Sequence, residues 1–131
     1  KSQLADMIEH ALIHRDKQIM LHDVRQVKAF EALPIHKFEH QTRAFLKIQD
    51  GCNQFCSYCI IPYARGAERS LKEEEALRVA TDLVKNGHLE IVLSGIHTGR
   101  YGRDIHTNLL HLMKRMVNEI DGLKTYSYFI H

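Results

Sequence analysis

The apolar residues after position 43 follow strand spacing and helical spacing in turn. Residues 44–49 alternate between apolar and polar, and residues 90–94 form a short apolar run typical of a buried strand. Between positions 70 and 87, and again between 107 and 122, apolar residues recur every three or four positions, which predicts two helices. Residues 123–130 again have strand character. The order strand, helix, strand, helix, strand predicts an α/β fold with a parallel sheet and right-handed crossovers.

Polar residues and glycines indicate where these two helices begin and end. Ser70 and Glu73 have the spacing of a capping box, and the acidic run 73–75 suits the first turn of a helix. Thr107 is the expected cap of the second helix, and a glycine follows each helix as its stop. The expected buried stripes are Ala76, Leu77, Ala80, Leu83 and Val84 in the first helix, and Leu109, Leu110, Met113, Met116, Val117 and Ile120 in the second.

The first 42 residues have weaker patterning. Residues 3–14 have apolar positions at helical spacing after Ser2, a possible cap, and predict a helix. Residues 18–22 fit a short strand or an apolar strap, and a further helical turn or two could follow before Pro34. We therefore expect residues 1–42 to be the end of one domain with a linker, and residues 43–131 to begin a second domain.

Composition narrows the class of protein. The chain has 131 residues, 44% of them hydrophobic and 26% charged, which is ordinary for a soluble domain. A net charge of +2 is too small to indicate nucleic-acid binding by itself. No apolar run approaches the length of a membrane span. The chain is short for a complete barrel enzyme and begins and ends abruptly, so we expect a fragment of a longer protein.

All three cysteines lie within eight residues, at positions 52, 56 and 59. Crowded thiols in odd number do not suit a secreted disulfide framework, and they favour a reducing cytoplasm. Soft thiolates suit zinc or an iron–sulfur cluster. Structural zinc needs four ligands, and the nearest histidines, His40 and His88, are not at paired spacing. Three thiolates on a cubane cluster would leave one iron open to another ligand. Incidental thiols on one helical face are the remaining alternative.

The residues around the cysteines carry a resemblance to a known family. The three-then-two spacing, with Tyr58 before the last cysteine, resembles the radical S-adenosylmethionine (SAM) signature. The stretches Gln49-Asp50-Gly51-Cys52-Asn53, Cys59-Ile60-Ile61-Pro62-Tyr63-Ala64-Arg65-Gly66 and Ser94-Gly95-Ile96-His97-Thr98-Gly99 resemble the tRNA methylthiotransferases. Within that family the likeness is strongest to the branch that acts on N6-threonylcarbamoyladenosine beside the anticodon.

The resemblance implies a fold, a reaction and a set of site residues. The fold would be the N-terminal part of a partial (βα) barrel of the radical SAM type. The reaction would generate a 5′-deoxyadenosyl radical from SAM and add a methylthio group to C2 of the modified adenosine in tRNA. An electron donor such as a flavodoxin would supply reducing equivalents. The 4Fe-4S cluster would be held by Cys52, Cys56 and Cys59, and SAM would be contacted by Tyr58, Arg65, Ser94 and Gly95.

This chain departs from the family pattern in several ways. The family has an N-terminal domain with three further cysteines that hold a second 4Fe-4S cluster, and a C-terminal RNA-binding barrel. This sequence contains neither, so we expect the fragment to be inactive alone. The segment 126–131 also differs from the serine-rich strand expected there. The simple alternatives are packing for Tyr58, a strand-to-loop turn for Ser94 and Gly95, and a solvated loop charge for Arg65. A surface or turn-stabilising role is favoured for His97. The rival functions are a methylthiotransferase acting on a ribosomal protein and a non-catalytic metal or iron–sulfur module.

Overall fold

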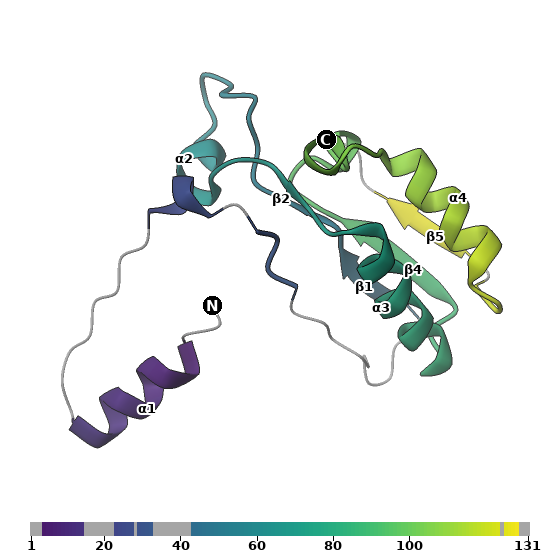
Figure 1. The fold of residues 1–131 in the computed structure, drawn as a ribbon, viewed down its shortest axis with the longest axis horizontal. Coiled ribbons are helices and arrows are strands. Elements are labelled where there is room, and N and C mark those ends of the chain that lie inside the picture. The colour runs from purple at the N-terminus through teal and green to yellow at the C-terminus, as the bar shows by residue number, and fades with distance from the viewer. Residues whose placement is uncertain (1–3, 15–22, 28, 33–42, 124, 129–131) are drawn as a thin grey trace.

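The computed structural model describes residues 4–14, 23–27, 29–32, 43–123 and 125–128. Its centre is a parallel sheet of three strands in the order β1-β4-β5 (Figure 1). The strands are β1 (Arg43–Lys47), β4 (Glu90–Ser94) and β5 (Thr125–Tyr128). The crossovers contain α3 (Glu73–Lys85) and α4 (Leu109–Glu119), which lie side by side against the sheet. The predicted α/β order is confirmed.

The predicted strand 44–49 is divided at Ile48. Its first part is β1, which pairs with β4, and the chain then forms β2 (Gln49–Asp50), which pairs antiparallel with β3 (Arg69–Ser70). Ile48 joins both pairings, since its N–H donates to Ser94 O at 2.9 Å and its carbonyl accepts from Leu71 N at 2.8 Å. The division turns the chain away from the sheet just before the first cysteine.

The remaining described elements are short or lie at the start of the chain. They are α1 (Leu4–His14), the 3₁₀ turn η1 (Val24–Gln26), α2 (Ile61–Arg65), and the 3₁₀ turns η2 (Thr98–Arg100) and η3 (Arg103–Ile105). The predicted first helix is confirmed as α1, but it buries none of its residues and stands apart from the sheet in Figure 1. Ser2 and the stretch 18–22 lie outside the described residues.

The hydrophobic core lies between the sheet and helices α3 and α4. The predicted stripe of α3 is confirmed, with Val84 partly buried at its margin. In α4 the prediction is only partly right, because Leu110 and Val117 are exposed and Leu112, which was not predicted, is fully buried. The buried core residues are Ala44, Leu46, Ile48, Leu71, Ala76, Leu77, Val79, Ala80, Leu83, Ile91, Leu93, Tyr101, Leu112, Met116 and Ile120.

The predicted starts of both helices are wrong, and of the two predicted glycine stops only Gly87 closes its helix. Helix α4 ends at Glu119 with Ile120 in extended conformation, before Gly122 is reached. Helix α3 begins after Lys72, and Ser70 instead lies in β3, where its Oγ accepts a hydrogen bond from Gly102 N at 2.8 Å. Helix α4 is capped by Asn108, whose Oδ1 accepts from His111 N at 2.9 Å, and not by Thr107. Gly87 has a positive φ and closes α3 in a Schellman motif.

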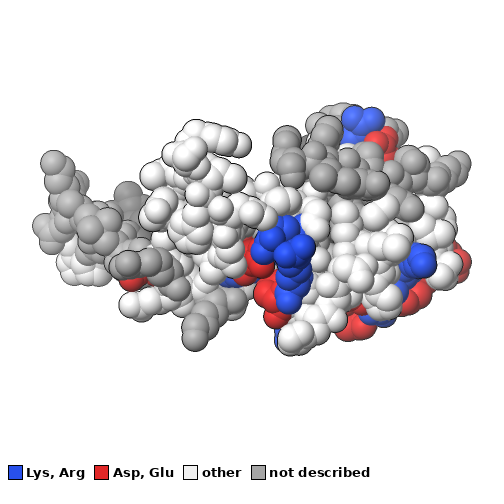
Figure 2. Space-filling model, turned by 90° about the horizontal axis from the view of Figure 1, so that it is seen from above, with Lys and Arg blue, Asp and Glu red and all other residues white. Residues whose placement is uncertain are grey.

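None of the helices that the structure describes has the length and apolarity to span a membrane. On the face shown in Figure 2, basic and acidic side chains lie next to one another and are not separated by sign, and much of the face is uncharged. This surface pattern agrees with the small net charge of +2.

Candidate functional site

The cysteines lie in a loop that leaves β2 and returns through α2 to β3, beyond the end of the main sheet (Figure 1). The base of the loop is closed by a hydrogen bond from Cys52 N to Gly66 O at 3.1 Å. Gly51 lies at the tightest point, where a Cβ atom would lie 2.0 Å from Ala67 O. Gly51 also has φ +73°, in the left-handed region that favours glycine. The close contact at Gly51 and the hydrogen bond at Cys52 therefore fix the position of the backbone where the cysteine loop begins.

The three thiols differ in their surroundings. Cys52 is buried at the base of the loop, Cys56 is exposed and Cys59 is half-buried, and all three are free of disulfide bonds. Cys59 N donates to Cys56 O at 2.9 Å, which forms a tight turn between these two residues. In the ranges that the structure describes, no three His, Cys, Asp or Glu side chains are gathered closely enough to hold one metal ion.

The donor set fits an iron–sulfur cluster by its chemistry. Three reduced thiols in one loop supply the soft ligands that iron–sulfur clusters require. Cys52 is fixed by the base of the loop, whereas residues 53–58 are exposed and not packed into the core. The loop can therefore adjust Cys56 and Cys59 around the fixed Cys52 without disturbing the sheet.

Asp50 lies directly before the loop and holds a group of cations. Its carboxylate lies 2.7 Å from Lys47 Nζ, 3.5 Å from Arg65 Nε and 3.6 Å from Arg69 Nη2. Burial alone would raise the pKa of Asp50, but Lys47, the Gly51 N–H and Arg65 together lower it below its ordinary value. Asp50 is therefore ionised at neutral pH, and it holds the half-exposed Arg65 beside the start of the loop.

Arg69 joins the returning end of the cysteine loop to the N-terminal connector, the segment that contains Val24 and Val27. Its side chain is buried, and Nη1 donates to the carbonyls of Arg65 and Ala67 at 3.0 Å and of Val27 at 3.4 Å. A Cβ atom on Gly66 would lie 2.4 Å from Val24 O, so the connector packs directly behind the loop. Sequence reasoning missed Arg69 because its hydrogen bonds go to backbone carbonyls, which leave no pattern in the sequence.

Ser94 and Gly95 lie at the carboxyl end of β4, next to the start of the loop. A Cβ atom on Gly95 would lie 2.9 Å from Gln49 Cβ, so the glycine permits close approach of the two segments. The side chain of Gln49 is fully buried there: Nε2 donates to Gly51 O at 2.7 Å, and Oε1 accepts from His97 N at 2.8 Å. Gln49 thus ties the cysteine loop to the loop after β4, a role that sequence reasoning did not assign.

The aromatic residues of the loop point largely to solvent. Tyr58 is 90% exposed, and the structure does not bring it together with Ser94 and Gly95. Phe55 has φ 48°, uncommon for a residue with a side chain, and its ring meets that of Tyr63 edge-on at 5.6 Å. The contact of Tyr58 with SAM stays a prediction.

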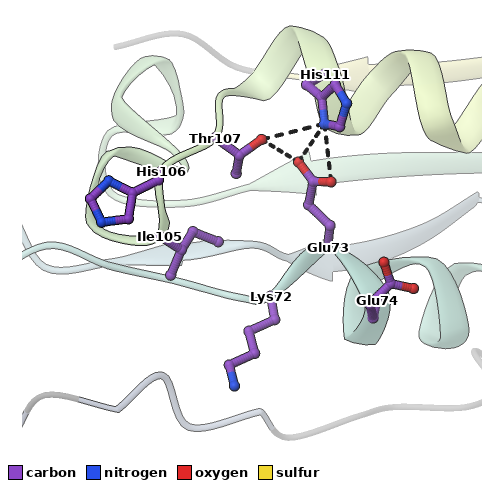
Figure 3. A pocket seen from close by; sticks show the side chains of 7 residues that line it. All are labelled: Lys72, Glu73, Glu74, Ile105, His106, Thr107 and His111. Atoms are coloured by element: carbon purple, nitrogen blue, oxygen red, sulfur yellow. Dashed lines mark hydrogen bonds and ion pairs between the residues drawn. The ribbon is translucent and has the colours of Figure 1, made fainter.

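A second group of polar residues lies where α3 and α4 begin. Figure 3 shows the Glu73 carboxylate beside the Thr107 hydroxyl and the His111 ring. His111 Nδ1 lies 2.9 Å and Arg115 Nη1 lies 3.1 Å from the Glu73 oxygens. A pocket of about 430 Å³ adjoins this group and is lined by Lys72, Glu73, Glu74, Ile105, His106, Thr107 and His111. Glu73 lies in the first turn of α3, as predicted, and its carboxylate also joins the two helices.

The Glu73 contacts predict a pH-dependent contribution to stability. Burial would raise the pKa of Glu73, but hydrogen bonds from Thr107, His111 and Arg115 lower it below its ordinary value of 4.5. The stabilisation is therefore fully present above pH 4.5 and is lost as pH falls through the lower pKa of the folded state. Glu73→Gln should lower the free energy of unfolding by about 2 kcal/mol at neutral pH, with a smaller deficit in acid. Urea unfolding of both proteins at a series of pH values from neutral to acid measures this difference in the free energy of unfolding.

Glu119→Gln is the matched control for that prediction. Glu119 binds the same Arg115, at 2.7 Å from its Nε, but lies one turn away on the same helix and is exposed. Exposed pairs at this spacing contribute little to stability, so Glu119→Gln should leave the free energy of unfolding nearly unchanged. Equal losses in the two variants would contradict the assignment of Glu73 as the link between α3 and α4.

Comparison with known proteins finds related sequences over most of the chain. The radical SAM superfamily matches residues 46–127. The threonylcarbamoyladenosine tRNA methylthiotransferase of Bacillus subtilis (strain 168) is 45% identical over 103 residues, which are 78% of this chain and 23% of that protein. The protein of the same name from Aquifex aeolicus (strain VF5) is 34% identical over 124 residues, 95% of this chain and 30% of that protein.

A second kind of relative is also similar. The tRNA-2-methylthio-N(6)-dimethylallyladenosine synthase of Clostridium beijerinckii is 38% identical over 101 residues, 76% of this chain and 22% of that protein. The chain thus spans less than a third of the length of the curated relatives it matches. The matched superfamily region includes the three cysteines, Ser94 and Gly95.

Proposed function

The chain belongs to the radical SAM superfamily, and from that premise we propose that it is the cluster-binding part of a tRNA methylthiotransferase that acts on N6-threonylcarbamoyladenosine. The names of the relatives from B. subtilis and A. aeolicus support this substrate. The single structural observation that carries the proposal is the link that Gln49 makes between the start of the cysteine loop, at Gly51, and the loop after β4, at His97. Ligand sites of parallel sheets lie at such strand ends.

The proposed roles of the residues follow from their positions. Cys52, Cys56 and Cys59 hold the 4Fe-4S cluster, and the chemistry supplied by this group is the reductive cleavage of SAM. Ser94 and Gly95 receive the methionine end of SAM at the strand end. Arg65, oriented by Asp50, is placed to bind the carboxylate of SAM. Tyr58 supplies an aromatic surface for the adenine end once the loop has adjusted around the cluster.

The proposal extends to the parts of the protein that act with this chain. Residues 1–42 are the end of an N-terminal domain and a connector, and residues 43–131 begin the radical SAM domain. The methylthiotransferase relatives imply a second 4Fe-4S cluster, which this three-cysteine sequence does not provide. A tRNA substrate, a flavodoxin-type electron donor and a cytoplasmic location complete the proposal.

Formation of 5′-deoxyadenosine tests the proposed chemistry. The chain is loaded with iron and sulfide without oxygen, reduced with dithionite and mixed with SAM, and the products are separated by chromatography. A brown, iron-containing chain is expected, and the full-length protein treated in the same way should release 5′-deoxyadenosine. A chain that stays colourless and takes up zinc instead would reject the proposal in favour of a structural metal module. A brown full-length protein that leaves SAM intact would favour an iron–sulfur module without catalytic function.

A further inference from the structure

The loop after β4 holds the base of the cysteine loop through contacts between residues far apart in the sequence. Its first contact is the His97 N–H donated to Gln49 Oε1. Its second is a two-pronged ion pair, in which Arg100 Nε lies 2.6 Å from Glu68 Oε2 and Arg100 Nη2 lies 3.1 Å from Glu68 Oε1. The loop after β4 therefore contacts both chain segments that form the base of the cysteine loop, the one before Cys52 and the one after Gly66.

Glu68 stands close to the fixed cysteine. It follows Gly66, whose carbonyl accepts the Cys52 N–H, and its own N–H donates to Asn53 Oδ1 at 3.4 Å. A shift of Glu68 would therefore also shift the backbone around Cys52. Arg100, in turn, extends from the loop that begins with Ser94 and Gly95.

The ion pair has the geometry and burial of a rigid link. The side chains of Arg100 and Glu68 are 18% and 12% exposed, so solvent screens their attraction only weakly. The hydrogen bonds that Arg100 donates to Glu68 raise the pKa of Arg100 against the effect of its burial, and the charge of Glu68 adds to the rise. A planar guanidinium facing a carboxylate with two hydrogen bonds fixes orientation as well as distance.

We propose that Arg100 is a positioning residue, which through Glu68 holds Cys52 at a fixed distance from Ser94 and Gly95. The inference rests on the proposed function, since the distance matters when a cluster on the thiolates and SAM at the strand end must meet. A lysine at position 100 would keep the charge but lose the two-pronged geometry. The side chain acts through Glu68 and needs no contact with SAM.

The test compares Arg100→Gln, Arg100→Lys and Glu68→Gln with the control Arg103→Gln, an exposed arginine in the neighbouring turn. The iron-loaded chain is titrated with SAM by equilibrium dialysis at a temperature where all variants are folded by circular dichroism. Removal of supporting groups around a metal site costs about 10- to 100-fold in affinity or activity. We expect the SAM dissociation constant to rise about tenfold in the first three variants and to stay unchanged in Arg103→Gln.

Two further measurements distinguish positioning from simple stabilisation. The double variant Arg100→Gln with Glu68→Gln should bind SAM no more weakly than either single variant, because both changes break one link. A lower melting temperature with wild-type SAM affinity in Arg100→Gln would overturn the proposal.

The proposal can also be tested without a cluster. In the metal-free chain, iodoacetamide should label Cys52 faster in Arg100→Gln than in the wild type, while Arg103→Gln labels like the wild type. Equal labelling rates in Arg100→Gln and the wild type would overturn the positioning role. Failure of the wild-type chain to bind iron would reject the proposed function alone, since the labelling rate reports on the link itself.

Discussion

Replacing Cys56 by alanine is expected to abolish stable cluster binding and leave the fold intact. Two thiolates remain in this variant, and the sequence contains no other cysteine to replace the third. Cys56 is the informative position because it is exposed, whereas Cys52 is buried and its replacement would also disturb packing. The iron-loaded variant should therefore be colourless after desalting, should contain little iron per chain, and should release no 5′-deoxyadenosine from SAM.

Ser57→Ala is the control for the Cys56 variant. Ser57 is the exposed neighbour of Cys56 in the same loop, so this variant experiences the same reconstitution and the same loop environment without losing a ligand. It should retain wild-type colour and iron content. Wild-type iron content in Cys56→Ala would contradict the assignment of the three cysteines as the ligand set. Unfolding of Cys56→Ala by urea should follow the wild-type curve, because the side chain contributes no buried surface.

The order of strands and helices could be predicted from the sequence because each element has its own hydrophobic period. Strand β4 was predicted with its observed bounds, Glu90–Ser94, since a short apolar run between turn signals is unambiguous here. The two faces of α4 were harder to assign. Leu110 and Leu112 are both apolar, and only the position of the helix against the sheet decides that Leu112 is buried and Leu110 exposed.

The predicted helix starts are wrong because the predicted cap residues form hydrogen bonds with residues far away in the sequence. Ser70 has the right spacing to Glu73, but its N–H donates to Asp104 and its hydroxyl accepts from Gly102, both more than 30 residues away. Glu73 likewise accepts from Thr107, the predicted cap of the other helix. A local rule weighs only neighbours in sequence and cannot foresee such competition.

The candidate site was predicted unevenly for a similar reason. The cysteines could be proposed as cluster ligands from their spacing together with the flanking residues, because ligands of one cluster lie close together along the chain or in space. Gln49 could not be singled out in this way. Strand alternation puts it on the other face of the strand from the buried side chains of Ala44, Leu46 and Ile48, and a polar residue on that face is unremarkable. Its burial follows only from the change of strand partner at Ile48, which turns its amide toward Gly51 and His97.

Gly51→Ala is expected to destabilise the domain by about 3 kcal/mol or more, because two separate costs add. Its φ of +73° is unfavourable for a residue with a side chain, and the new methyl would lie 2.0 Å from Ala67 O and 2.7 Å from Gly66 O. Both obstacles are backbone atoms, so relief requires the two sides of the loop base to separate. Separation would weaken the hydrogen bond from Cys52 N to Gly66 O, and should expose Cys52.

Gly87→Ala separates these two costs. Gly87 has a similar φ of +92°, but no atom lies within 4 Å of the position that its Cβ would take. This variant should therefore carry only the conformational cost, about 1–2 kcal/mol. Urea unfolding of the two variants measures the difference, and the rate of iodoacetamide labelling of Cys52 should rise in Gly51→Ala alone. Equal destabilisation with unchanged labelling would show that close approach at Gly51 does not hold the base of the loop together.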